Sequence, residues 1–175
     1  FIAPLLILAT LFGVLAGGAW VWTGVFLLGV GIIIDTLYTK QTMGAGFDDE
    51  GELNANPLLM NLTMYAMLPV FIALQCVLAY QIYNGMAGVE LLGAVVSSGI
   101  FAGIGIIYGH ELAHTKGFSF LIARWMMALS GSSHFCYAHV YNHHLELGCE
   151  NDPATAPRGR SLYAHLPKSY FGQSK

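Results

Sequence analysis

The sequence predicts an all-α protein that lies in a membrane as a bundle of helices. Of its 175 residues, 55% are hydrophobic and only 10% are charged, whereas average soluble domains carry roughly 25% charged residues. The mean hydropathy is +0.59. The apolar residues gather in four long segments, and a helix needs about 20 mostly apolar residues to cross a bilayer. These observations predict an integral membrane protein with four spans.

The first two spans form a predicted helical hairpin. Residues 1–16 make up the first span, which we expect to be cut at its start because the chain opens inside an apolar run. Residues 19–38 make up the second span, after a turn at Gly17-Gly18. Residues 39–56 follow as a polar loop, which we interpret as a solvated acidic segment. Its carboxylates belong to Asp48, Asp49, Glu50 and Glu52.

The next two spans form a second predicted hairpin. Residues 58–83 make up the third span, and Asn56 and Pro57 suit the N-cap and the first position of its helix. Residues 89–108 make up the fourth span, after a short Asn-Gly turn. Beyond it, residues 119–129 are apolar but too few to span easily. We expect them to form a helix at the membrane interface or under the bundle.

The basic residues predict how the spans are oriented. All seven lysines and arginines follow either the second or the fourth predicted span, so they share one face of the membrane. The positive-inside rule makes that face cytoplasmic. Both of the histidine clusters described next lie on the same face. No basic stripe of the kind that binds nucleic acid is present in the sequence.

Five histidines in two short clusters mark the predicted functional region. His110 and His114 lie where the fourth apolar segment ends, and their spacing places two imidazoles on one helical face. His139 and His143 repeat this spacing, and His144 is expected to point about 100° away. A neutral imidazole is a good ligand for iron, zinc, copper or nickel. Because a catalytic zinc uses about three protein ligands, five histidines suit two metal ions, or one metal with an elaborate shell.

Three carboxylates are candidates for the surroundings of this site. Glu111 follows the first histidine, where it suits a role in orienting a ligand imidazole. Asp35 lies near the cytoplasmic end of the second span, at a depth similar to that of His110, and ionisable residues within spans are usually functional. Asp152 lies in a predicted turn, where it is a candidate partner for a ligand histidine.

The sequence has two further histidines, and its first cluster also fits another chemistry. His134 precedes the second cluster and is interpreted as a buried histidine or an outer neighbour of the metal, and His165 is not expected to be a ligand. The string His-Glu-x-x-His is also the signature of zinc proteases, in which the glutamate, here Glu111, is the general base. An intramembrane zinc metalloprotease therefore remains an alternative, although the sequence has no later Leu-Asp-Gly segment to supply an aspartate ligand.

Several short motifs carry a resemblance to a known family. They are Gly-His-Glu-Leu-Ala-His at 109–114, Gly-Ser-Ser-His-Phe at 131–135, Ala-His-Val-Tyr-Asn-His-His at 138–144 and Asp-Pro-Ala-Thr-Ala at 152–156. With the Asp35 element that ends the second span, they resemble the membrane-bound alkane monooxygenases (alkane hydroxylases). This family includes the hydroxylase component of xylene monooxygenase and is related to the membrane fatty acid desaturases.

The resemblance implies a non-haem di-iron centre at the cytoplasmic face of a six-helix bundle, in a multi-pass protein of the bacterial inner membrane. It implies hydroxylation of the terminal methyl group of an alkane with O2, giving a primary alcohol. Electrons come from NADH through rubredoxin and its reductase, or through a ferredoxin-type reductase. The iron ligands that it implies are His110, His114, His139, His143 and His144.

The resemblance also implies that a third histidine box and two further spans lie outside these residues. We therefore expect residues 1–175 to be the N-terminal part of a single domain, with the histidine-box region at 109–175. A hydrocarbon dissolved in the bilayer would enter an apolar groove between spans, and we expect Phe26, Leu27 and Ile33 to line it.

Departures from the family pattern leave the substrate open. Ala138 and Asn142 stand where alkane hydroxylases usually have glutamate and glycine, and Thr115 replaces a basic residue. The start of the second box is closer to the xylene enzyme, whereas the Asp-Pro-Ala-Thr stretch is closer to the alkane enzymes. A methyl-arene such as xylene or toluene is therefore an alternative substrate. A fatty acid desaturase or hydroxylase is another alternative, although its second box usually has the tighter His-x-x-His-His spacing.

Overall fold

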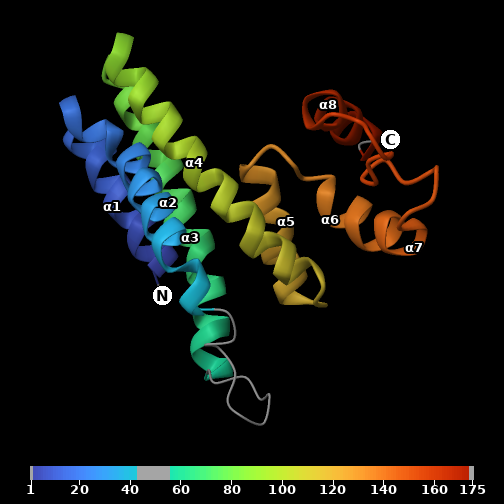
Figure 1. Ribbon diagram of the computed structural model, residues 1–175. Coiled ribbons are helices and arrows are strands. Elements are labelled where there is room, and N and C mark those ends of the chain that lie inside the picture. Colours follow the sequence, from blue (N-terminus) through green and yellow to red (C-terminus); the bar gives the residue numbers. More distant parts are fainter. Residues whose placement is uncertain (1, 43–55, 174–175) are drawn as a thin grey trace. The chain divides into compact units, whose positions relative to one another are not determined.

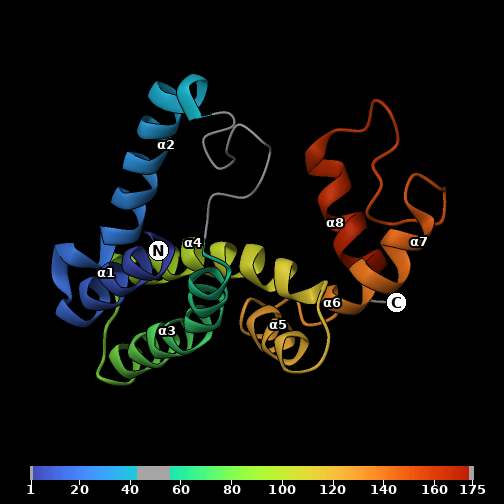
Figure 2. The same cartoon turned by 90° about the horizontal axis from the view of Figure 1, so that it is seen from below.

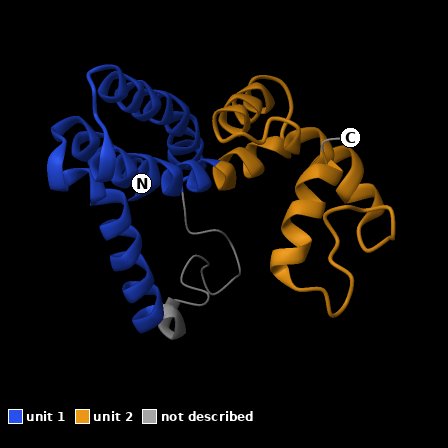
Figure 3. Ribbon diagram, turned by 90° about the horizontal axis from the view of Figure 1, so that it is seen from above, with its two compact units in different colours: residues 1–105 blue, residues 106–175 orange. Residues whose placement is uncertain are grey.

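The computed structural model describes residues 2–42 and 56–173, and over these residues the regular elements are helices, with no strand (Figure 1). The predicted all-α class is confirmed. The acidic loop with its four carboxylates lies outside the described residues. The chain divides into two compact units, Phe1–Gly105 and Ile106–Lys175 (Figure 3).

The first unit contains the long apolar helices. Three of its helical segments are long and apolar enough to cross a membrane, namely Gly18–Tyr38, Pro57–Tyr83 and Gly88–Ala113. The segment Ile2–Ala16 is apolar but shorter, so three of the four predicted spans meet this length. The helices of the first unit are α1 (Ile2–Ala16), the short 3-10 helix η1 (Gly18–Trp22), α2 (Thr23–Thr42), α3 (Pro57–Tyr83) and most of α4 (Gly88–Ala113).

Turns and caps in this unit lie where the sequence predicts them. Gly17 and Gly18 have φ values of 74° and 56°, a left-handed conformation that glycine adopts without steric cost. They separate α1 from η1. Asn56 caps α3, because its side chain accepts hydrogen bonds from the amides of Leu58 and Leu59. Pro57, the first residue of α3, has no amide hydrogen to leave unpaired at this position.

The core of the first unit lies where α1 packs along α3. Hydrogen bonds of polar side chains also join α3 and α4 to the end of α1 and the turn that follows it. The Gln81 side chain on α3 donates to the carbonyl oxygens of Val14 and Leu15 at 2.9 and 2.8 Å, and the Glu90 carboxylate accepts from the Gly18 amide at 2.6 Å. The later part of α2 extends away from the other helices of the first unit (Figure 2), and every residue from Gly31 to Tyr38 is exposed. The fully buried side chains of this core include Ile7, Val14, Met67, Phe71 and Leu74.

The second unit carries the histidines. The predicted helix at 119–129 is α5, which begins one residue earlier and buries one face, including Met126 and Met127. Gly109 on α4 allows this face of α5 to approach closely, since a Cβ atom at Gly109 would lie 3.1 Å from the Met127 methyl carbon. The Tyr170 hydroxyl of α8 donates to the Gly131 carbonyl at 2.7 Å. In chain order the elements after α4 are α5 (Phe118–Leu129), α6 (Phe135–Ala138), η2 (His139–His143), α7 (His144–Glu146) and α8 (Leu162–Gln173).

Candidate metal centre

The first histidine cluster lies at the end of α4. The predicted fourth span ends at Tyr108, but α4 continues to Ala113, so His110 is in its last turn and His114 follows directly. The two rings lie 5.1 Å apart between centroids. The Thr115 hydroxyl donates to the Leu112 carbonyl at 2.6 Å. The Thr115 amide donates to the same carbonyl at 3.1 Å, so one residue caps the C-terminal end of α4 with two hydrogen bonds.

The second cluster lies on a π-helical turn. Residues His139–His143 form η2, in which backbone hydrogen bonds join residues five apart and the turn is wider than in an α-helix. The regular α-helical register implied by the four-residue spacing is therefore wrong here, because the turn also brings residues five apart together. The wider turn brings the Nε2 atoms of His139 and His144 to 3.0 Å. The His143 ring still stacks beside His139, at 5.5 Å between centroids.

Three histidines from both clusters converge. The candidate ligand atoms of His110, His114 and His139 all lie within 4.8 Å of one another. The Nε2 atoms of His114 and His139 are 3.3 Å apart. Two imidazole nitrogens that share one metal ion at about 2.1 Å each lie roughly 3.0–3.4 Å apart in tetrahedral or octahedral geometry. The spacings of His139 to His114 and to His144 fall in this range, so the donor set fits a metal ion.

The surroundings of His139 favour the neutral form that binds metal. Its side chain is only 9% exposed. Burial, followed by the positive charge that His110, His144 and His114 would carry, lowers the pKa of His139 to about 4. At neutral pH its ring is therefore unprotonated and has a lone pair available for a metal ion.

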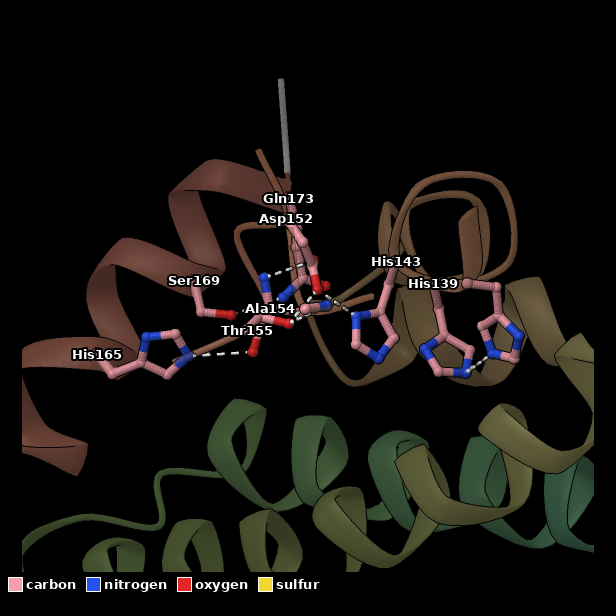
Figure 4. A network of polar contacts seen from close by, with 10 residues as sticks. His139, His143, Asp152, Ala154, Thr155, His165, Ser169 and Gln173 are labelled. Atoms are coloured by element: carbon pink, nitrogen blue, oxygen red, sulfur yellow. Dashed lines mark hydrogen bonds and ion pairs between the residues drawn. The ribbon is translucent and has the colours of Figure 1, made fainter. Parts of the chain in front are cut away.

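A buried carboxylate holds His143 of the second cluster. Asp152 Oδ2 lies 2.8 Å from His143 Nδ1 (Figure 4). Burial opposes ionisation of Asp152, but hydrogen bonds from Thr155, the Ala154 amide and His143 outweigh it and lower the pKa of this carboxyl. Ligand histidines commonly donate their second ring nitrogen to a carboxylate in this way. The arrangement leaves Nε2 of His143 available to a metal ion.

The other predicted neighbours occupy different surroundings. Glu111 is exposed at the end of α4. His134 packs edge-on against the Tyr170 ring, at 5.1 Å between centroids. Asp35 belongs to the first unit, whereas the histidine clusters belong to the second. His165 is buried, with Nε2 at 3.2 Å from the Ala154 carbonyl oxygen.

One ring contact of the site was not predicted. The Phe135 ring stacks on the His139 ring, at 5.0 Å between centroids and 10° between planes, and meets His110 edge-on at 5.8 Å. Phe135 therefore covers apolar faces of two candidate ligands. Its position four residues before His139 places both side chains on one helical face, and this spacing could have identified the contact.

The first unit contains an apolar cavity of about 290 Å³ between α1, α2 and α4. Of the three residues expected to line a substrate groove, Leu27 lines this cavity. Phe26 instead lines a neighbouring hollow with Trp20, and Ile33 is exposed. The lining of the cavity is Leu6, Leu27, Leu28, Gly31, Ile32, Asp35, Ile100, Phe101 and Ile104.

Comparisons with known proteins agree with the resemblance to the alkane monooxygenases. The fatty acid desaturase family model matches residues 87–175, which include all five clustered histidines. The chain is 25% identical, over its whole length, to the xylene/toluene monooxygenase hydroxylase component of Pseudomonas putida, covering 47% of that protein. It is 29% identical to alkane 1-monooxygenase 1 of Alcanivorax borkumensis, over 89% of this chain and 39% of that protein.

A further relative matches the chain over a shorter stretch. Alkane 1-monooxygenase of Ectopseudomonas oleovorans is 33% identical over 57% of this chain, which covers 25% of that protein. The chain thus spans less than half the length of each of these curated relatives. Their names identify oxidoreductases that act as monooxygenases.

Proposed function

Because the chain belongs to the fatty acid desaturase family, we propose that it is part of a membrane non-haem di-iron monooxygenase. The full protein hydroxylates the terminal methyl group of alkanes to primary alcohols. The observation that carries this proposal is the convergence of His110, His114 and His139, whose ligand atoms lie within 4.8 Å of one another. His144 and the Asp152-bound His143 complete the set of five candidate iron ligands.

The histidines hold and tune the metal in this proposal. Iron held by these histidines would supply the open coordination positions and the redox chemistry that the activation of O2 requires. His139 enters the site as a neutral base, because burial keeps its pKa near 4. Asp152 holds the proton of His143 on Nδ1 and so directs Nε2 toward the metal. Phe135 covers the His139 ring and limits the access of water to it.

The net reaction inserts one oxygen atom of O2 into a C–H bond and reduces the other atom to water. NADH supplies the electrons through rubredoxin and its reductase, or through a ferredoxin-type reductase. The names of the curated relatives support this class of reaction. We place the protein in the bacterial inner membrane, with the histidine clusters on the cytoplasmic face that the lysines and arginines predict.

The apolar cavity of the first unit supports a hydrocarbon substrate. Its lining is aliphatic and aromatic apart from Asp35, and a hydrocarbon offers only apolar surface for recognition. The match to the xylene/toluene enzyme over the whole chain makes a methyl-arene the second candidate substrate. Because the matching family model is that of the fatty acid desaturases, desaturation of an acyl chain is a further candidate reaction.

Metal and product analysis of the full-length protein tests the proposal. We expect about two irons per protein, because five clustered histidines exceed the need of one metal ion. With NADH and its electron carriers under labelled O2, medium-chain alkanes should yield primary alcohols that carry one labelled oxygen. Xylene and toluene are tested beside them. An unsaturated product without incorporated oxygen would identify a desaturase, and stoichiometric zinc without iron would favour the metalloprotease.

A further inference from the structure

Thr155 lies at the centre of the polar network behind His143 (Figure 4). Its hydroxyl donates to Asp152 Oδ2 and accepts a hydrogen bond from the Gly148 amide at 3.1 Å. Asp152 Oδ2 is also the atom that His143 Nδ1 contacts. One threonine hydroxyl therefore joins the carboxylate behind a candidate iron ligand to the loop that follows α7.

The network fixes both oxygens of this carboxylate. The Ala154 amide donates to Asp152 Oδ1 at 2.9 Å, while Thr155 and His143 share Oδ2. The terminal torsion of an aspartate side chain is broad and weakly restrained by itself. Contacts on both oxygens hold the plane of the carboxylate, and this plane sets the direction in which His143 Nδ1 donates.

A residue of α8 also holds the turn that contains Asp152 and Thr155. Nε2 of the buried His165 lies 3.2 Å from the Ala154 carbonyl oxygen, in the same peptide segment whose amide holds Asp152. The Asp152–Thr155 turn is therefore held from two sides. His165 holds its backbone, but Thr155 touches the carboxylate oxygen that meets His143.

We propose that Thr155 is a positioning residue of the metal centre, which acts through Asp152 on His143. The inference rests on the proposed function, because it requires that His143 binds iron. Loss of the hydroxyl frees the carboxylate to rotate and leaves His143 without a fixed direction. Mutation of groups behind metal ligands typically weakens metal binding about 10–100-fold. Since Thr155 lies one hydrogen bond further from the metal, we expect about a tenfold loss.

Iron retention by the purified full-length holoprotein against a chelator tests this inference. Thr155→Val keeps the shape of the side chain and removes the hydroxyl, so we expect half-removal of iron at about tenfold lower chelator concentration. Thr155→Ser keeps the hydroxyl and should restore retention. Ser169→Ala is the matched control, because it removes a hydroxyl of α8 that accepts from Gln173 at 2.7 Å, and it should behave as wild type.

A double-mutant cycle separates positioning from a general loss of stability. If Thr155 acts through Asp152, Thr155→Val should add nothing to the loss that Asp152→Ala causes. Thermal unfolding should show that Thr155→Val stays folded at the temperature of the chelator assay. Unfolding then does not account for its loss of iron. Wild-type retention in Thr155→Val, or losses that add fully in the cycle, overturns the inference alone. A wild-type protein without iron overturns the proposed function together with the inference.

Discussion

His139 is the residue at which the contacts of the candidate metal centre meet. Its Nε2 atom lies within 3.3 Å of Nε2 of both His114 and His144, and the Phe135 ring covers one face of its imidazole. Since it links the end of α4 to the π-helical turn, its loss should remove the shared ligand between the two histidine clusters.

We expect His139→Ala in the full-length protein to lose most of its iron and its hydroxylation activity, because a ligand shared by both clusters cannot be replaced by the others. Metal analysis of the purified variant measures this. His134→Ala is the matched histidine control, because this ring packs against Tyr170, and we expect it to keep its iron. Normal iron content in His139→Ala would exclude this residue as a ligand.

Gly31 offers a way to change the volume of the apolar cavity. It lines the apolar cavity, and a Cβ atom added to it has nothing within 4 Å. Gly31→Leu should therefore occupy part of the cavity without a clash and shift the substrate preference toward shorter alkanes. Each methylene that no longer fits costs roughly 0.8 kcal/mol, or about fourfold in relative turnover.

Competition between alkanes of different length, with products separated by gas chromatography, measures this shift. Gly29→Leu is the control on the same helix, because Gly29 also has open space and is not part of the cavity lining. Equal profiles for the two variants would show that the cavity does not select the substrate.

The sequence singled out the histidines and one carboxylate of the candidate site, but not all of the residues that contact them. The five histidines and Asp152 were predicted because histidine is scarce in the rest of the chain and metal ligands need carboxylate partners. Phe135 and Thr155 were not assigned a role. Phenylalanine and threonine are common in apolar helices and turns, so only the folded geometry shows that they touch His139 and Asp152.

The π-helical turn is the element that determines how the second cluster is arranged. Sequence spacing predicted an ordinary α-helix there, with His139 and His143 on one face. The extra residue in the turn also brings His144 to His139, while His143 still stacks beside His139 and contacts Asp152. A π-turn costs regular hydrogen bonds and forms where the rest of the fold compensates, so local sequence does not reveal it.

Removing one residue from this turn tests its role. Deletion of Val140 places His139 and His144 four residues apart, so that a regular α-helical turn brings them together as the π-helical turn does now, and we expect the full-length variant to keep its iron and its helical content. Metal analysis and far-ultraviolet circular dichroism measure the two quantities. Deletion of Gly159, in the exposed loop before α8, is the control and should keep the iron. Loss of iron after deletion of Val140, with unchanged helical content, would contradict this account of the turn.

At the scale of the whole molecule, the sequence predicted the helical class and the helix ends within a few residues. The turn at Gly17-Gly18 and the cap at Asn56 lie as predicted, because both depend on local backbone chemistry. The predicted span ends at Tyr108, whereas α4 continues to Ala113, as the helical spacing of His110 and His114 requires. Polar residues such as His110 and Glu111 end an apolar pattern but do not end a helix, so composition alone placed its end too early.

Topology gives a test at the same scale. With α4 as a span, cysteines introduced at Ala87 and at Arg158 should react with an impermeant reagent from opposite faces of the membrane in the full-length protein. Arg158→Cys and Lys116→Cys should share one face, since both residues follow α4. The labelling is carried out in a variant without reactive native cysteines. Reaction of positions 87 and 158 from one side would contradict the predicted orientation.

The double contact of Gln81 with the end of α1 has a consequence for biogenesis. Gln81 is 66 residues beyond Leu15, whose carbonyl it satisfies. In the hydrocarbon region an unpaired carbonyl costs several kcal/mol, and α1 therefore cannot bury this end until α3 has been synthesised. The nascent chain must keep the end of α1 near water during this interval. We therefore expect the end of α1 to reach its final place only after α3 has been inserted.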